Sequence, residues 1–195
     1  MEREYLSIDH YLEESTKKDN KENVLATFFQ KKNYEPKSDT EKLIIENFSF
    51  IAAAMSLLIH IAMKKGQVLG QEKNEIINRL VFQLRQRPFE RSNYSEDYGK
   101  AEINIVTNLY DKLLDEYENK RMDIEDQIDL INFVYQNNQQ KRFFIVRLFF
   151  YIAFADRSLE ISEIDTINTL AKSLSVDDED IKRIKAEVIE ELKLR

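Results

Sequence analysis

Two long apolar runs stand out in this 195-residue sequence, and a folded chain must bury both on nearly all sides. The first is FSFIAAAMSLLIHIAM at residues 48–63, and the second is FFIVRLFFYIAFA at residues 143–155. Arg147 interrupts the second run. Helices that are apolar nearly all round lie in the core of a bundle or cross a membrane. The sequence therefore predicts two central helices.

The first run does not fit a membrane span. It is shorter than the ~20 residues that a helix needs to cross a bilayer. It also contains Ser49, Ser56 and His60. We therefore expect a helix buried within a water-soluble bundle and no membrane span.

Composition favours an all-α fold and excludes several functions. Three Gly and two Pro leave few residues for the tight reversals of a β-sandwich or barrel. The absence of Cys excludes disulfides, thiolate catalysis and Cys-liganded zinc. A net charge of −7 argues against a broad nucleic-acid-binding surface. The first residues have mixed charges and lack the features of a secretory signal, so we expect a cytoplasmic protein.

The apolar periodicity predicts about eight or nine helices. The first residues predict two short amphipathic helices, and Pro36 followed by the capping box Ser38-x-x-Glu41 marks a new start. We therefore predict an N-terminal helical extension at residues 1–36 and an all-α domain at residues 37–195. Between and after the central helices, amphipathic helices are expected to end near Arg87 and to span about residues 103–117, 124–134, 161–174 and 181–192. The predicted long loop is FERSNYSEDYG at residues 89–99.

A weak internal repeat relates the two apolar runs. It aligns IHIAMKKGQVLGQEKNEIINRL with FYIAFADRSLEISEIDTINTL. The Ile-Ala pairs match directly, whereas Asn78 and Leu80 match Asn168 and Leu170 after a one-residue slip in the loop. Such self-similarity predicts two related helical hairpins packed about a pseudo-twofold axis.

The second copy, YIAFADRSLEISEIDTINTLAKSLSVDDED, resembles a known family. It is similar to the TerB-like domains, which are associated with tellurite resistance and with the N-terminal region of certain membrane-anchored J-domain co-chaperones. The shared pattern is an apolar helix, an Ala-Asp-Gly turn, a Glu-rich helix start and a small-x-Leu-Ser tail. The resemblance extends over about residues 40–190. It implies a helical domain that acts in a stress or envelope-associated complex.

The resemblance also implies that acidic residues at the two turns bind a divalent cation. In this chain the turn reads ADR at residues 155–157 and KKG at residues 64–66, so one copy keeps the Asp and the other keeps the Gly. Asp156 and Glu163 match the acidic positions of the family. Together with Glu160 they form the candidate metal site.

The residues of this turn also fit a purely structural role. An EF-hand calcium loop starting at Asp156 would need Gly and Glu where this chain has Ile161 and Ile167. Ser162 and Asp165 instead resemble a capping box, and the carboxylate at the turn can accept backbone N–H groups. Two interpretations stay open, a capped restart of the helix and a divalent-cation site.

The sequence lacks a complete catalytic set. His10 and His60 have no Glu three residues before them, which excludes the Glu-x-x-His pair of di-iron bundles. No nucleophile elbow, His-Glu-x-x-His motif or Gly-rich phosphate loop occurs. We predict that His60 is a core or partly buried histidine with a local hydrogen bond. Asp126 and Asp129 are predicted to lie on a solvated helix face.

These observations predict a non-catalytic domain that binds a protein or serves as a scaffold. The partner is another protein or a second copy of the chain, and the residues alone leave both open. The alternative is a divalent-cation sensor that uses the turn at residues 156–163. No cofactor other than that cation is expected, and no nucleic acid.

Overall fold

The computed structural model describes residues 39–85, 96–135, 137–156 and 160–193. The predicted extension at residues 1–36 and the capping residue Ser38 lie outside these ranges. The two expected N-terminal helices, the total of eight or nine and the domain boundary therefore stay predictions.

The described ranges contain seven α-helices, one short 3₁₀ helix and no strand, which confirms the all-α class. In chain order they are α3 (Asp39–Ala62), η1 (Met63–Lys65), α4 (Gly70–Arg85), α5 (Glu96–Glu118), α6 (Ile124–Val134), α7 (Gln139–Ala153), α8 (Ile161–Ser173) and α9 (Asp178–Lys193). The predicted loop at residues 89–99 is wrong at its end, because α5 already begins at Glu96.

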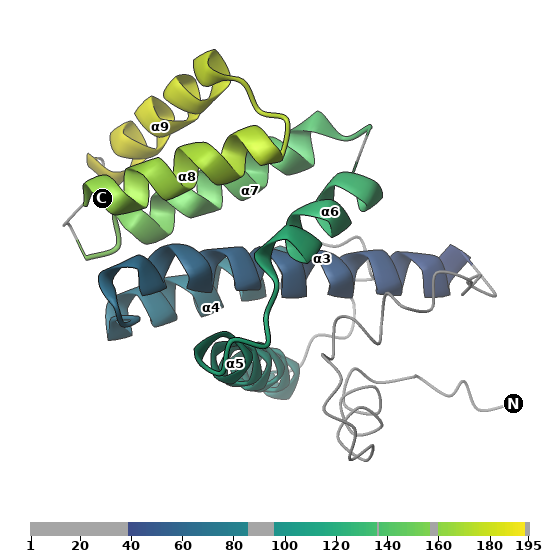
Figure 1. The fold of residues 1–195 in the computed structure, drawn as a ribbon. Coiled ribbons are helices and arrows are strands. Elements are labelled where there is room, and N and C mark those ends of the chain that lie inside the picture. Colours follow the sequence, from purple (N-terminus) through teal and green to yellow (C-terminus); the bar gives the residue numbers. More distant parts are fainter. Residues whose placement is uncertain (1–38, 86–95, 136, 157–159, 194–195) are drawn as a thin grey trace, which may run out of the picture.

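Helix α3 runs through the middle of the described fold (Figure 1). It contacts α4, α5, α6, α7 and α8, and α7, α8 and α9 lie on the side opposite α5. Ala52, Ala53 and Ala54 are fully buried, so their small side chains let neighbouring helices come close. Both predicted central helices are thus confirmed, as α3 and α7. No helix in the described ranges combines the length and apolarity needed to cross a membrane.

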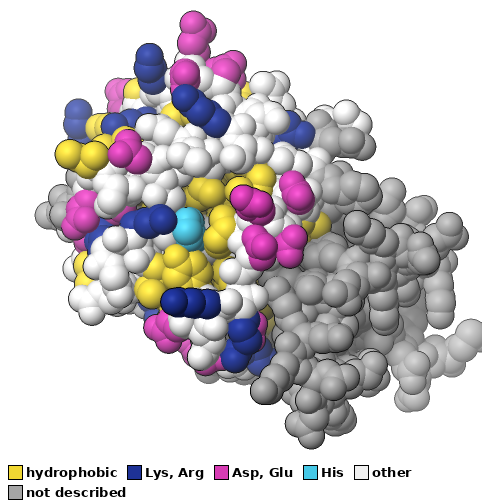
Figure 2. Space-filling view, in the orientation of Figure 1, with side chains coloured by type: hydrophobic (Ala, Val, Ile, Leu, Met, Phe, Trp, Pro, Cys, Tyr) yellow, Lys and Arg dark blue, Asp and Glu magenta, His cyan; other side chains and the backbone are white. Residues whose placement is uncertain are grey.

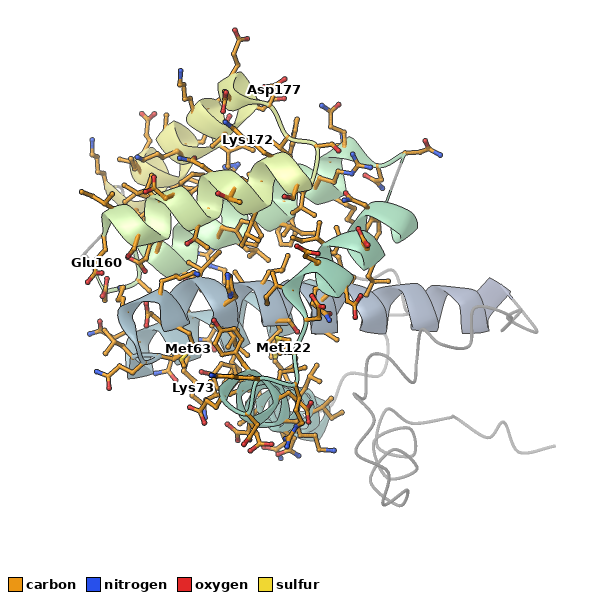
Figure 3. All side chains as sticks on the ribbon, viewed as in Figure 1. Met63, Lys73, Met122, Glu160, Lys172 and Asp177 are labelled. Atoms are coloured by element: carbon orange, nitrogen blue, oxygen red, sulfur yellow. The ribbon has the colours of Figure 1, made fainter. Side chains whose placement is uncertain are left out.

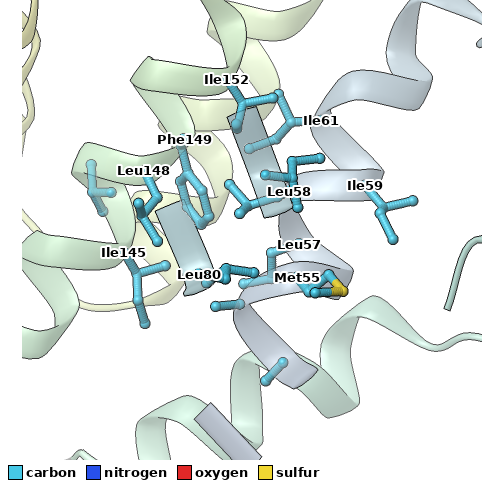
Figure 4. Close-up of a cluster of buried hydrophobic side chains, with 14 of the residues drawn as sticks. Met55, Leu57, Leu58, Ile59, Ile61, Leu80, Ile145, Leu148, Phe149 and Ile152 are labelled. Carbon is cyan, nitrogen blue, oxygen red and sulfur yellow. The ribbon is translucent and has the colours of Figure 1, made fainter. Parts of the chain in front are cut away.

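The core forms where α3, α4 and α7 interlock (Figure 4). Its fully or almost fully buried side chains include Leu57, Leu58, Ile61, Leu80, Leu148, Phe149 and Ile152. Ser56 is also buried, and its hydroxyl donates a hydrogen bond to the carbonyl of Ala52 at 2.9 Å. The polar group therefore remains paired within its own helix.

Arg147, which interrupts the second apolar run, ties α7 to α9. Its guanidinium donates to Glu187 at 2.7 Å and also pairs with Glu191. The hydroxyl of Tyr151 donates to Glu191 as well. On the other side, the guanidinium of Arg79 on α4 lies 3.5 Å from the centre of the Tyr151 ring. The polar interruption of α7 thus faces partners on α9 rather than the apolar core.

Candidate functional site

Three carboxylates and one ammonium group meet between two turns of the fold. Nζ of Lys65 lies 2.5 Å from Oδ2 of Asp156, and 3.2 Å from Oε1 of both Glu72 and Glu163. The side chain of Lys65 is 9% exposed, that of Asp156 is 8% exposed, and the two glutamates are 0% exposed. These four residues are called the Lys65 cluster below. The cluster joins the turn between α3 and α4 to the turn between α7 and α8.

The backbone at the first turn places Lys65 in the cluster. Lys65 ends η1, and the N–H of the next residue, Gly66, donates to the carbonyl of Met63 at 2.9 Å. Gly66 has φ of +88°, a left-handed conformation that residues with a side chain rarely adopt. The KKG sequence therefore ends the helix sharply and sends the chain towards α4.

The two glutamates of the cluster occupy equivalent positions at the starts of α4 and α8. Glu72 accepts a hydrogen bond through Oε2 from the N–H of Leu69 at 2.7 Å, and Glu163 accepts one through Oε2 from the N–H of Glu160 at 3.0 Å. In both residues Oε1 is the oxygen nearer Lys65. Each carboxylate thus caps its own helix with one oxygen and contacts the ammonium with the other.

The two turns have the same length in the structure. Lys65 lies five residues before Gly70, where α4 begins, and Asp156 lies five residues before Ile161, where α8 begins. The predicted one-residue slip is therefore wrong for these turns. The slip followed from matching Asn and Leu identities farther along the helices, which do not set the length of a turn. The two-hairpin repeat itself stays a prediction.

The cluster carries more negative than positive charge when all its groups are ionised. Burial lowers the pKa of Lys65, but hydrogen bonds to Asp156, Glu72 and Glu163 outweigh it and raise the pKa overall. Burial raises the pKa of Glu163, against the opposing effects of the Glu160 N–H and of Lys65. Lys65 therefore stays charged at neutral pH, and Glu163 takes up a proton more readily than an ordinary glutamate.

The structure brings together two of the three residues of the candidate metal site. Asp156 and Glu163 both contact Lys65, whereas Glu160 is exposed at the start of α8 (Figure 3). The hydroxyl of Ser162 donates to the Glu160 carboxylate at 3.4 Å. Within the described ranges, no group of three or more His, Cys, Asp or Glu residues is arranged to hold a metal ion. An ammonium group already stands among the carboxylates that converge here.

The predicted cap at Ser162 is wrong. Helix α8 begins at Ile161, with Glu160 as its N-cap and Glu163 at the third helical position. The carbonyl of Ser162 accepts a hydrogen bond from the Thr166 hydroxyl at 2.7 Å, as expected for a residue inside the helix. The capping pattern is therefore present but begins two residues earlier.

Sequence reasoning missed Lys65 and Glu72 as members of the site. The KKG turn lacks the acidic residue of the family pattern, and this absence gives no reason to expect a charge partner in it. The spacing offered a signal, because Glu72 follows Lys65 at the same distance as Glu163 follows Asp156. Aligning the turns by this spacing would have placed all four residues together.

His60 is half-buried, as predicted, but its hydrogen bond is not local. Its Nδ1 lies 2.9 Å from the hydroxyl of Tyr117 on α5, and the two groups share a hydrogen bond. Burial, with a smaller effect of the nearby Lys64, lowers the pKa of His60 from 6.5 to about 4. His60 is therefore neutral at physiological pH and joins α3 to α5.

We expect His60 to contribute to acid sensitivity. Because its pKa is lower in the folded chain, the unfolded chain binds more protons, and this part of the stability is lost as the pH falls from about 6.5 towards 4. Thermal midpoints measured across this range should fall less steeply for His60→Gln than for the unaltered chain. Tyr117→Phe, which keeps the imidazole, serves as the control for loss of the hydrogen bond. Identical slopes in His60→Gln and the unaltered chain would contradict this role.

Half-buried apolar side chains surround His60 on one face of the molecule. This His60 patch consists of His60, Met63, Tyr117 and Met122, all of intermediate exposure. The His60 and Tyr117 rings lie 5.6 Å apart. Figure 2 shows apolar side chains around the histidine, and Figure 3 labels the two methionines on the same side. Aromatic rings and flexible thioethers here remain accessible to solvent.

Exposed carboxylates of α6 follow directly after the patch in the chain. Asp123 caps α6 by accepting the N–H of Glu125 at 2.8 Å. Glu125, Asp126 and Asp129 are exposed, which confirms the predicted solvated face, and none of them pairs with a Lys or Arg in the described part of the chain. Acidic side chains lie beside the patch in Figure 2. Apolar and acidic surfaces thus adjoin here.

Comparison with known proteins identifies the family. The family model described as "Tellurite resistance protein TerB" matches residues 51–186, which is more than half of the chain. No curated protein and no solved structure matches the chain. The matched range includes α4 to α8 and both turns of the Lys65 cluster. The chain therefore belongs to the TerB family.

Proposed function

We propose that this chain is a non-catalytic TerB domain that binds a protein partner. The observation that carries the proposal is the meeting of the His60 patch with the exposed acidic face of α6. By contrast, the Lys65 cluster is buried and its charges contact one another. Such a cluster suits a structural role better than acid–base chemistry on a substrate.

The chemistry of the surface favours a basic, amphipathic segment as the partner. Apolar side chains of the partner would cover Met63 and Met122, and its Lys or Arg side chains would face Asp126 and Asp129. Complementary charge speeds association and selects against acidic partners. Membership of the TerB family supports a place for this contact in a stress or envelope-associated complex.

The proposal predicts that partner binding depends on α6. A double charge reversal, Asp126→Lys with Asp129→Lys, is expected to weaken binding at least about tenfold and to reduce its salt dependence. The matched control is Glu179→Lys with Glu190→Lys on α9. All four acidic residues are exposed, and Asp126 and Glu179 each lie in the first turn of their helix. Partners are identified by cross-linking and purification, and affinities are then measured with the purified partner.

Three outcomes would contradict the proposal that this surface binds a basic segment of another protein. The first is equal loss of binding in the α6 variant and the α9 control. The second is a partner without a basic segment. The third is a self-association that light scattering detects and that α6 reversal abolishes, which would assign the surface to a second copy of the chain.

A divalent-cation sensor is the second candidate function. The convergence of Asp156 and Glu163 on one point favours it, because hard cations prefer carboxylate oxygens. Glu160, the third predicted ligand, is exposed and contacts Ser162 instead. The Lys65 ammonium lies where the carboxylates converge, which makes this function the weaker candidate.

A further inference from the structure

We infer that the Lys65 ammonium takes the place of a divalent cation in this chain. Carboxylates from α4, from the turn after α7 and from α8 converge on its Nζ at 2.5 to 3.2 Å. A bound divalent cation would be expected to attract the same oxygens and to join the same elements. The family resemblance implies such a cation, but the residues present do not fit one, because a side-chain cation is already there.

Because the Lys65 cluster is buried, its carboxylates depend on the ammonium that stands in place of a cation. The four side chains are at most 9% exposed, and carboxylates in such surroundings need a positive charge or a proton. A lysine supplies one positive charge and is attached to the chain. The pairing of the two turns therefore does not depend on the concentration of free cations.

The distances from Nζ also show how far the glutamate oxygens would have to move to bind a cation once the ammonium is removed. Both Oε1 atoms lie 3.2 Å from Nζ, so they would have to move inward by less than about 1 Å to reach a calcium–oxygen distance of ~2.3–2.6 Å. Lys65→Ala removes the side chain that blocks this movement. Lys65→Met removes the charge but keeps a chain of similar length in the same place.

The experiment compares thermal unfolding of the full chain with each of these two variants, in chelator and in millimolar calcium or magnesium. In chelator, both variants are expected to unfold about 10 °C below the unaltered chain. Added cation is expected to restore about half of that loss in Lys65→Ala. It is expected to change neither Lys65→Met nor the unaltered chain. Calorimetric titration of the Ala variant provides a direct measurement of binding.

Each other result overturns the inference. Stabilisation of the unaltered chain by cation would show that Lys65 does not exclude it. Lack of recovery in Lys65→Ala, or equal recovery in both variants, would show that the ammonium does not stand in for a cation. Unchanged stability of both variants in chelator would remove its structural role. Lys65 neutralises these carboxylates whether or not α6 binds a partner, so failure of either proposal leaves the other intact.

Discussion

Truncation of Phe149 to Ala is expected to lower the free energy of unfolding by about 3–5 kcal/mol. The ring is fully buried in α7, where it packs among side chains of α3 and α4 (Figure 4). Its removal leaves a cavity that the surrounding helices can fill only in part, because a close-packed core relaxes incompletely around a truncated side chain. Chemical denaturation followed by circular dichroism measures the loss.

Ile161→Ala is the control for this truncation. Ile161 is also a large apolar residue, but its side chain is 78% exposed, so its truncation should change stability by no more than about 0.5 kcal/mol. A loss below about 1 kcal/mol for Phe149→Ala, with an unchanged denaturant slope, would contradict the packing described for α7.

Replacement of Lys65 by Met is expected to cost about 3–5 kcal/mol, because it removes the ammonium that contacts three buried carboxylates. The cost comes from the remaining carboxylates rather than from lost packing, since Met has a similar length. Adding Glu163→Gln to Lys65→Met should therefore recover about 1–2 kcal/mol. The amide oxygen of Gln can still cap α8. A double-mutant cycle measured by denaturation gives this coupling.

The loss caused by Lys65→Met should also depend on pH. Without the ammonium, Glu163 loses an interaction that opposes the effect of burial, so its pKa in the folded chain rises further and the folded chain binds more protons than the unfolded chain. The penalty is then largest at neutral pH and shrinks as the pH falls towards the ordinary pKa of glutamate. A penalty that stays constant from neutral pH to about pH 5, or an additive double mutant, would show that lost packing explains the effect.

The sequence predicts the helices of this fold better than its side-chain contacts. The apolar runs identify α3 and α7 because periodicity is a local property. The beginning of α5 at Glu96 was missed, since serine, asparagine and glycine near it also suit a loop. The partners of His60 and Lys65 were missed for a different reason. Tyr117 lies 57 residues from His60, and Asp156 lies 91 residues from Lys65, so only packing brings them together.

The side-chain contacts of the candidate metal site were likewise harder to predict from the sequence than its helices. Asp156 and Glu163 are predicted ligands because they match the acidic positions of the family, and the structure does place both in one cluster. Glu160, the third predicted ligand, is an acidic residue of the same turn but lies at the surface. Which carboxylates face inward depends on where α8 starts, and the predicted cap at Ser162 put that start at the wrong residue.

Glu72 and Glu163 each cap a helix and also contact Lys65. This double role connects the turn before α4 to the turn before α8. If the first turn of α4 frays, Glu72 leaves the amide of Leu69 and the ammonium of Lys65 together. Glu163 contacts the same ammonium with one oxygen while it caps α8 with the other. Because one ammonium contacts the capping residues of both helices, we expect the openings of the amino ends of α4 and α8 to be coupled. Two helix starts that are far apart in the sequence are thus linked through one lysine side chain.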